Sequence, residues 1–125
     1  MKIESARLLL DRYILACEVR DVDGIVNCFD PTAVVSDPLC ESIAGKQAIA
    51  AYFRGLYEGL ASLRLSVGDL YCKGDEVACH WIGHAVRTDR QEFKYQGIDV
   101  FKLSAEPAIL RLTAYWDPAT FPGLV

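Results

Sequence analysis

Asp99 interrupts a row of apolar residues in the segment YQGIDVF, residues 95–101, which makes it the first candidate for chemistry. Alternate residues of a strand share one face, so Asp99 lies in a row with Tyr95, Gly97 and Phe101. An unpaired carboxylate is costly to bury, so a carboxyl on this face is expected to stay protonated and to donate a hydrogen bond at neutral pH. The alternative is that Asp99 faces solvent and the other row of the strand, which has polar ends, is buried.

A second carboxylate, Asp37, ends the row that it forms with Ala33 and Val35 in the segment TAVVSDP. Pro38 follows it, and proline cannot continue the hydrogen-bond ladder of a strand. By itself, an Asp-Pro pair is a common turn former without a chemical role. Beside an apolar cleft, the same carboxylate would suit a general base.

Tyr13 belongs to an apolar stripe at helical spacing over residues 5–19, with Leu9, Leu10 and Cys17. A tyrosine on such a stripe is most often a core residue whose hydroxyl is bonded to a neighbour. Together with the two aspartates, however, it would supply one base and two neutral donors within an apolar cleft. Abstraction of a proton next to a carbonyl group requires such a set of groups.

The elements that position these residues follow from the spacing of apolar residues. Helices are expected over 5–19, from an N-cap at Asp21 to about Phe29, and over 45–60. Strands are expected where apolar and polar residues alternate between turn-like stretches: 30–38, 62–73, 76–88, 91–103 and 108–116. This order predicts one α+β domain, residues 1–125, with the helices packed on one face of a curved sheet that encloses a pocket.

The composition limits the kinds of partner. The chain has 125 residues, of which 52% are hydrophobic and 24% charged, and its net charge is −4, values typical of a soluble globular domain. No basic cluster is present to neutralise phosphates, which argues against nucleic acids and anionic membranes as partners. No apolar run has the length of a membrane span or the pattern of a signal peptide.

The five cysteines are odd in number and form no Cys-x-x-Cys pair, so a disulfide framework is not expected and a reducing cytoplasm is favoured. As small side chains, they fit the core. The sequence also lacks a glycine-rich phosphate loop, a Gly-x-Ser-x-Gly elbow and a zinc-like Cys/His cluster, so neither a metal nor a cofactor is expected.

Four segments carry a resemblance to a known family. They are, in order, RYILACEVRDVDGIVNCFDPTAVVSDP, GKQAIAAYF, GIDVFKL and TAYWDP, and together they extend over nearly the whole chain. Their order and spacing resemble those of the bacterial ketosteroid isomerases, which lie within the nuclear-transport-factor-2-like (NTF2-like) and SnoaL-like superfamily. The resemblance implies a cone of three N-terminal helices on a strongly curved, mostly antiparallel sheet around an apolar pocket, often in a homodimer.

The resemblance also implies roles for the three residues. Asp37 matches the family's general base, which carries a proton from the carbon between a ketone and an alkene to the far end of the dienolate. Tyr13 and Asp99 match the donors that bind the developing oxyanion, Asp99 as a protonated carboxylic acid. The implied reaction is a steroid Δ-isomerase-like shift of a C=C bond into conjugation with the ketone of a small hydrophobic, steroid-like substrate.

A relative of the same fold without this activity is the alternative, because a shared fold does not determine a reaction. Such a relative would be a SnoaL-like cyclase or hydratase, or a protein that only binds small hydrophobic molecules. Retention of all three functional residues favours the isomerase, since a pure binding protein has little reason to keep two acids on apolar faces.

Further pocket residues follow from the same resemblance. Phe53 occupies the position at which the family often carries a tyrosine that supports the catalytic one, and the helix register directs Tyr52 and Tyr57 elsewhere. Trp116 fits as an apolar wall for a flat polycyclic substrate. Phe101, from the row of the strand acid, is expected to contribute another apolar surface to the pocket.

His80 and His84 share one strand face with Ile82 and Val86 in the segment 76–88. Four strand residues span about 13 Å, which is too far for the two histidines to hold one metal ion. Their row faces either the outer side of the sheet, where a dimer partner would lie, or the pocket. In the second case His84 and Ile82 line the pocket, and the substrate is smaller or more oxygenated than a steroid.

Overall fold

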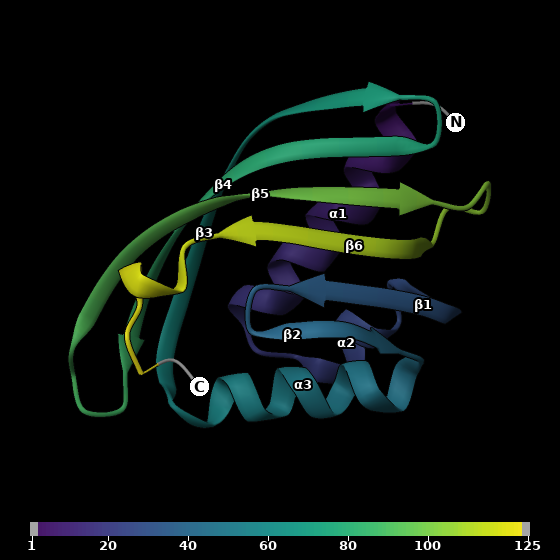
Figure 1. The fold of residues 1–125 in the computed structure, drawn as a ribbon. Coiled ribbons are helices and arrows are strands. Elements are labelled where there is room, and N and C mark those ends of the chain that lie inside the picture. The colour runs from purple at the N-terminus through teal and green to yellow at the C-terminus, as the bar shows by residue number, and fades with distance from the viewer. Residues whose placement is uncertain (1–2, 124–125) are drawn as a thin grey trace.

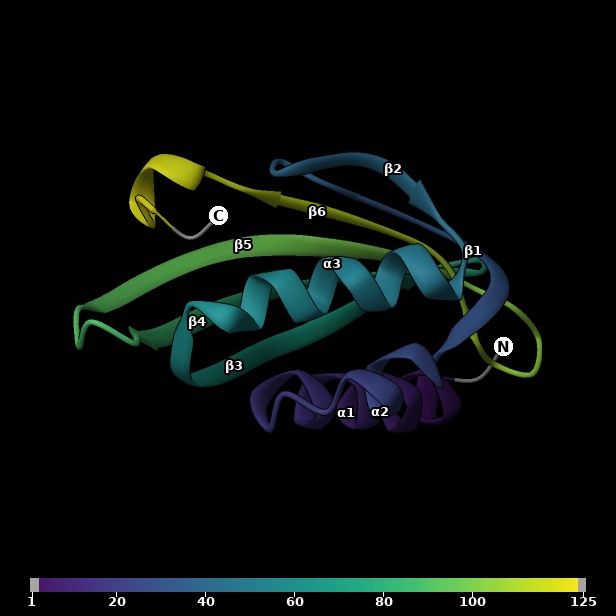
Figure 2. The same ribbon diagram turned by 90° about the horizontal axis from the view of Figure 1, so that it is seen from below.

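The computed structural model describes residues 3–123, which form helices packed against a single sheet (Figure 1 and Figure 2). The helices are α1 (Ile3–Glu18), α2 (Val22–Val26) and α3 (Lys46–Glu58), and a short 3-10 helix is η1 (Pro118–Thr120). The strands are β1 (Phe29–Asp37), β2 (Cys40–Ala44), β3 (Leu60–Lys73), β4 (Glu76–Arg87), β5 (Glu92–Leu103) and β6 (Ile109–Trp116). The predicted α+β class is therefore confirmed.

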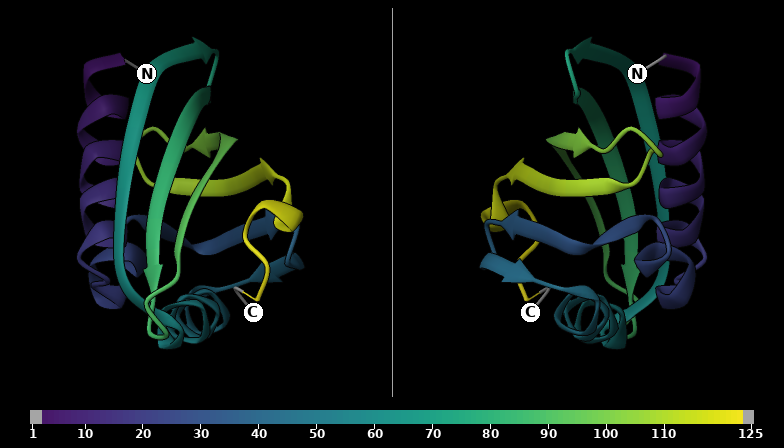
Figure 3. Two further views of the ribbon diagram at one scale, coloured as in Figure 1. Left: turned by 90° about the vertical axis from the view of Figure 1, so that its left-hand side faces the viewer. Right: turned by 90° about the vertical axis from the view of Figure 1, so that its right-hand side faces the viewer.

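The sheet is mixed, with the strand order β2-β1-β6-β5-β4-β3. The four long strands β3 to β6 pair antiparallel, as predicted, and β1 pairs parallel to β6. Figure 3 shows how strongly the sheet curves, with α1 beside β3 and α3 across one end of the curve. This curvature turns side chains of β1, β4, β5 and β6 toward one cavity.

Strand β2 is an element that the sequence does not predict, because its segment CESIA shows no alternation of apolar and polar residues. It forms where the chain reverses after Asp37 and pairs antiparallel with β1, with Cys40 opposite Asp37. Its side chains are half-buried or exposed, so backbone pairing rather than burial accounts for the strand.

Helix α2 begins as predicted and ends earlier. The carboxylate of its N-cap, Asp21, accepts a hydrogen bond from the backbone N–H of Gly24 over 3.1 Å. The helix ends at Val26 and not near Phe29, because Phe29 already begins β1 and is buried in the core.

The alternation along β5 confirms that the row of Asp99 faces the interior. Gly97, Asp99, Phe101 and Leu103 are all buried, whereas Ile98, between two of them, is 47% exposed. An apolar row turned toward the helices therefore carries one carboxyl near its centre.

Within residues 3–123, no helix covers the outer face of the sheet (Figure 2). Ile98 on β5 and Tyr115 on β6 are cross-strand partners on that face, and they are 47% and 59% exposed. The outer face thus presents adjacent large apolar side chains to its surroundings.

No helix among the described residues is long and apolar enough to cross a membrane. The five cysteines all lie in the described part of the chain and are free, as their number and spacing predicted. Cys17, Cys28 and Cys79 are buried, which confirms their expected place in the core, whereas Cys72 is exposed.

Gly97 allows two tryptophans to approach the backbone of β5. It pairs with Trp81 on β4 and with Trp116 on β6. A Cβ atom at Gly97 would lie 2.6 Å from Trp81 Cζ2 and 2.4 Å from the carbonyl oxygen of Tyr115, distances at which atoms overlap. The close packing of the Trp81 indole and of β6 against β5 therefore requires a residue without a side chain here.

Gly97→Ala is expected to lower the free energy of unfolding by about 1–3 kcal/mol, because the added methyl group overlaps with backbone that cannot move independently. Gly55 in α3 is a matched control, since a Cβ atom there meets no atom within 4 Å. Gly55→Ala is expected to stabilise the protein by about 0.5–1 kcal/mol through helix propensity. Urea unfolding of both variants measures the difference, and equal effects would contradict the proposed overlap at Gly97.

Candidate active site

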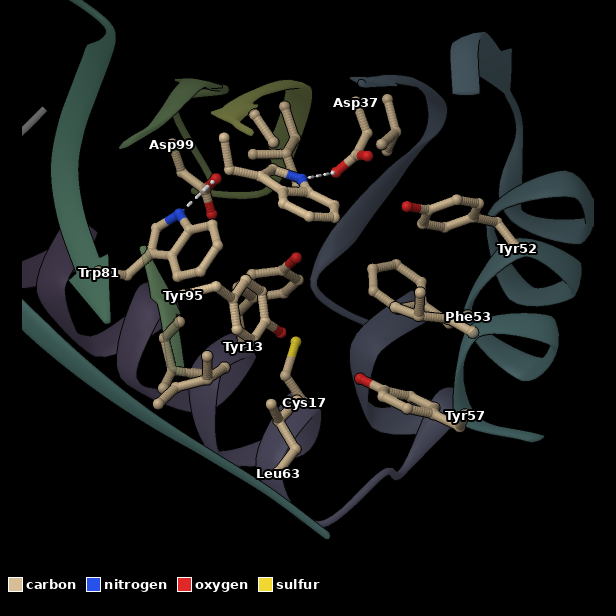
Figure 4. Close-up of a pocket in the computed structure, with 17 residues that line it drawn as sticks. Tyr13, Cys17, Asp37, Tyr52, Phe53, Tyr57, Leu63, Trp81, Tyr95 and Asp99 are labelled. Atoms are coloured by element: carbon tan, nitrogen blue, oxygen red, sulfur yellow. Dashed lines mark hydrogen bonds between the residues drawn. The ribbon is translucent and has the colours of Figure 1, made fainter. Parts of the chain in front are cut away.

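A cavity of about 730 Å³, part of it open to solvent, lies between α1, α3 and the curved sheet (Figure 4). The three residues that the sequence singles out for catalysis, Tyr13, Asp37 and Asp99, all line the cavity, each from a different element. Most of the remaining lining side chains are aromatic or aliphatic.

Asp99 is a buried carboxyl, with 8% of its surface exposed. Its Oδ1 accepts a hydrogen bond from Trp81 Nε1 over 3.0 Å. Burial raises the pKa of Asp99 from 3.8 to about 7; the bond from Trp81 opposes this rise, and the nearby charge of Asp37 adds to it. Near neutral pH, much of the protein therefore carries a protonated Asp99 that can donate a hydrogen bond.

Asp37 has a different environment at the end of β1, where it is half-buried. Its Oδ1 accepts a hydrogen bond from the backbone N–H of Leu39 over 2.9 Å, and its Oδ2 accepts one from Trp116 Nε1 over 3.1 Å. Two N–H donors, one on each oxygen, suit an ionised carboxylate, which only accepts. The bond from Leu39 also makes Asp37 the turn former that its Asp-Pro sequence indicated.

Tyr13 projects from α1 and is held between two phenylalanines. Its ring packs edge-on against Phe29 and Phe101, with ring centres 5.8 Å and 5.7 Å apart, and only 5% of the residue is exposed. Burial raises the pKa of Tyr13 well above its usual value, and Cys17 and Asp99 add to this rise. The hydroxyl therefore stays neutral and is able to donate.

Tyr52 and Tyr57 both line the cavity, which corrects the prediction that the register of α3 directs them elsewhere. Tyr57 follows Phe53 by one helical turn and shares its face, with the two ring centres 6.0 Å apart. Tyr52 precedes Phe53, and the cavity is wide enough at this point to include both. Figure 4 shows the two hydroxyls directed from α3 into the cavity.

Phe53 and Trp116 lie where the sequence placed them, on the wall of the cavity. Phe53 is buried and contributes an aromatic surface. Trp116 is more than the expected apolar wall, because its indole N–H donates to Asp37. Sequence reasoning did not find this bond, since it joins residues on two strands whose pairing was not predicted.

Three residues that were expected in the pocket lie outside it. Phe101 is fully buried behind Tyr13 and does not line the cavity. Ile82 and His84 project from the opposite face of β4, where His84 is exposed and its Nε2 lies 3.8 Å from Glu92 Oε1. The inward row of β4 contains Trp81 instead, so the outer-face alternative for the two histidines is the one that the structure has.

Trp81, Tyr95 and Cys17 also line the cavity, although sequence reasoning gave them no role there. Simple spacing was an available signal for two of them, because Tyr95 shares the strand row of Asp99 and Cys17 lies one helical turn after Tyr13. Among residues 3–123, no group of three or more His, Cys, Asp or Glu side chains is arranged to hold a metal ion.

A family model described as a SnoaL-like domain matches residues 10–111. Among similar solved structures is SalBIII, an epoxide hydrolase/cyclase-like enzyme of pyran ring formation in the polyether salinomycin, with 22% identity, 95% coverage of each chain and a TM-score of 0.83. A protein with a ketosteroid isomerase-like fold from Catenulispora acidiphila DSM 44928 has 11% identity over 90% of this chain and 87% of that chain, with a TM-score of 0.82. An NTF2-like protein of unknown function from Burkholderia pseudomallei K96243 has 14% identity over 90% and 91% of the two chains, with a TM-score of 0.81. At these identities the likeness establishes the NTF2-like fold.

The buried carboxyl of Asp99 predicts that stability depends on pH. Because its pKa is raised from 3.8 to about 7 on folding, the folded state binds the extra proton, and stability falls as the pH rises through this window. Across the whole range between these two pKa values, the free energy of unfolding is expected to fall by on the order of 4 kcal/mol. In Asp99→Asn this loss is expected to disappear, which can be measured as the free energy of unfolding of both proteins between about pH 4 and pH 8.

Asp69→Asn is the matched control, because Asp69 is exposed on β3 and its substitution removes the same charge. This variant is expected to keep the slope of the wild type. An Asp99→Asn variant with an unchanged slope would show that Asp99 is not the group whose burial is linked to stability.

Proposed function

The chain belongs to the SnoaL-like domain family, and we propose that its cavity catalyses proton transfer on a small hydrophobic ketone. The reaction would move a carbon–carbon double bond into conjugation with the ketone, as a steroid Δ-isomerase does. One observation carries the proposal: a single apolar cavity combines a carboxylate that accepts two N–H bonds, Asp37, with two neutral donors, Tyr13 and Asp99.

In the proposed mechanism, Asp37 removes a proton from the carbon between the ketone and the alkene. The electrons of the broken C–H bond form a double bond to the carbonyl carbon, and the carbonyl oxygen takes the negative charge of a dienolate. Tyr13 and Asp99 donate hydrogen bonds to that oxygen. Asp37 then returns the proton to the far carbon of the dienolate, and the ketone re-forms.

The surroundings of the two donors support this division of roles. Tyr13 and Asp99 are both buried, so the hydrogen bonds that they donate to a substrate would act in a medium of low dielectric. Removal of one donor of this kind commonly lowers kcat by about 10²–10³-fold. Asp37 is half-buried, which leaves it accessible to a substrate at the end of β1.

A cyclase or hydratase is the second candidate, and the tyrosines of α3 favour it. Tyr52 and Tyr57 bring hydroxyl groups to a wall that would otherwise be apolar, which suits an oxygen-rich substrate. Asp37 would take the proton of an attacking hydroxyl or water, and Asp99 would give one to the oxygen that leaves. Incubation with a hydroxy-epoxide distinguishes the outcomes by liquid chromatography with mass detection. Ring closure gives a product with the mass of the substrate and a different retention time, and hydration adds one water.

The isomerase proposal predicts that a β,γ-unsaturated ketosteroid is converted to its conjugated isomer, followed by the ultraviolet absorbance of the enone. Asp37→Asn is expected to lower kcat by about 10²–10⁴-fold, because the amide cannot act as a base. The exposed Asp69→Asn variant is expected to keep wild-type activity. Undiminished activity in Asp37→Asn would exclude Asp37 as the base.

We also propose a homodimer in a reducing cytoplasm, for which the exposed apolar face of the sheet and the five free cysteines are the support. Ile98→Lys on the outer face of β5 is expected to give monomers in light scattering, because it places a charge in the proposed interface. Leu8→Lys is the control, since Leu8 is 67% exposed on α1, away from that face. A wild-type mass of a single chain would exclude the dimer.

A further inference from the structure

Both tryptophans of the chain donate to an acid of the cavity. Trp81 Nε1 donates to Asp99 Oδ1, and Trp116 Nε1 donates to Asp37 Oδ2. Tyr95 lies between the two indoles, with its ring centre 5.3 Å from that of Trp81 and 5.5 Å from that of Trp116, in edge-to-face contact with each. We call Trp81, Tyr95 and Trp116 the aromatic row.

The geometry of the strands explains how Trp81 reaches its acid. Trp81 pairs with Gly97 across β4 and β5, and Cys79 pairs with Asp99, so the indole extends diagonally to the next inward residue of β5. It lies over Gly97, where a Cβ atom would be 2.6 Å from its Cζ2. The indole is 8% exposed, and its position is therefore set by packing on all sides.

A second glycine gives the middle of the row its place. A Cβ atom at Gly83 on β4 would lie 2.7 Å from Cε1 of Tyr95, so the tyrosine ring lies directly against the backbone of β4. Tyr95 is in turn packed against Phe121, with ring centres 5.1 Å apart. These contacts hold Tyr95 and, through it, the edges of both indoles.

The bond from Trp81 bears on where the proton of neutral Asp99 resides. A protonated carboxyl has one O–H oxygen, which donates, and one carbonyl oxygen, which is the better acceptor. An indole N–H is a donor only, so the oxygen that faces it must act as an acceptor. The bond therefore favours the form of the neutral acid in which Oδ1 is the carbonyl oxygen and Oδ2 carries the proton.

We propose that Trp81 is a positioning residue, which holds neutral Asp99 with its proton on Oδ2 so that this proton is available to an oxygen of the substrate. The role rests on the proposed function, in which Asp99 is an oxyanion donor. Without the indole N–H, the two oxygens of the acid are no longer distinguished and the carboxyl is free to turn. Tyr95 supports the same role, since it packs against the edge of the indole.

The same bond has a second effect, opposite in sign, that makes the role measurable. An N–H donor stabilises the ionised carboxylate, so Trp81 holds the pKa of Asp99 lower than burial alone would set it. Loss of the indole N–H therefore raises this pKa and keeps Asp99 protonated to a higher pH. A substitution that only loosened the structure would admit water and lower the pKa toward its usual value.

Five other titratable groups interact with Asp99: Tyr13 and Cys17 on α1, Asp37 on β1, Cys79 on β4 and Tyr95 on β5. Burial raises the pKa values of the two cysteines to about 12 and those of the two tyrosines above their usual range. These four groups stay neutral near pH 7. Their titration therefore does not overlap with that of the Asp99 carboxyl.

The first test is a carbon-13 NMR titration of protein labelled at the aspartate carboxyl, with the Asp99 signal assigned by its loss in Asp99→Asn. Trp81→Phe is expected to move the midpoint of Asp99 to higher pH. Trp116→Phe is the matched control, because it removes the indole donor of Asp37 and leaves that of Asp99, so no upward movement is expected. An unchanged or lowered midpoint in Trp81→Phe would overturn the proposal.

The second test measures the affinity for a phenol, a mimic of the oxyanion, below the midpoint of the wild type. Trp81→Phe is expected to bind it about tenfold more weakly, although a larger fraction of its Asp99 is protonated, because one oriented hydrogen bond is lost. Wild-type affinity in Trp81→Phe would overturn the positioning role. If Trp81→Phe does not fold, benzothienylalanine at position 81, which keeps the shape and replaces N–H by sulfur, is used in both tests.

The two proposals fail separately. A wild-type protein that neither isomerises the ketosteroid nor binds the phenol contradicts the proposed function. The NMR titration does not depend on turnover or on a ligand, so in that case it still decides whether Trp81 controls the protonation of Asp99.

Discussion

Burial of the Asp99 carboxyl is the constraint on which the rest of the cavity depends. A carboxyl removed from water needs a hydrogen-bond partner inside the protein, and the indole of Trp81 provides it. The indole lies against the backbone of β5 because Gly97 has no side chain. Tyr95 packs edge-to-face against this indole and also against Trp116, whose indole donates to Asp37. One solvation requirement thus explains a glycine, the register of two strands and the order of three aromatic rings.

The same cavity places two chemically identical side chains in unlike surroundings. Asp99 sits in the middle of a strand, where it is surrounded by side chains, whereas Asp37 sits where a strand ends and a turn supplies a backbone N–H. The difference in burial and in hydrogen-bond partners between the two aspartates therefore follows from their positions along a strand. The fold alone does not provide this difference, since chains of 11% to 22% identity share it under different descriptions. The functional assignment accordingly rests on the surroundings of the two acids.

The sequence predicted the inward face of a strand correctly where the apolar residues alternate along one row only. Alternation along β5 was sufficient to predict that Asp99 faces inward, because only one row of that strand is apolar at every position other than Asp99. It did not decide the facing of β4, where both rows contain apolar residues and His84 shares its row with Ile82. It also misplaced Tyr52, since spacing gives the face of a helix but not the width of the cavity that the face meets. Tyr57 was misplaced although its spacing from Phe53 gave the correct face. Strand β2 and the bond from the last strand to Asp37 depend on pairing between distant segments, which no local pattern encodes.

The parallel pairing of β1 with β6 has a consequence for how the protein is made. Trp116 and Asp37, which are joined by a hydrogen bond, are 79 positions apart in the sequence. Strand β6 lies between β1 and β5, so β1 joins the rest of the sheet only through β6. During synthesis, Tyr13 and Asp37 emerge from the ribosome long before β6 has been made. Contacts between segments this far apart in the sequence therefore form late and slow the assembly of the native state. A nascent chain therefore carries Tyr13 and Asp37 without a closed cavity around them. The cavity is complete only when the final strand is in place.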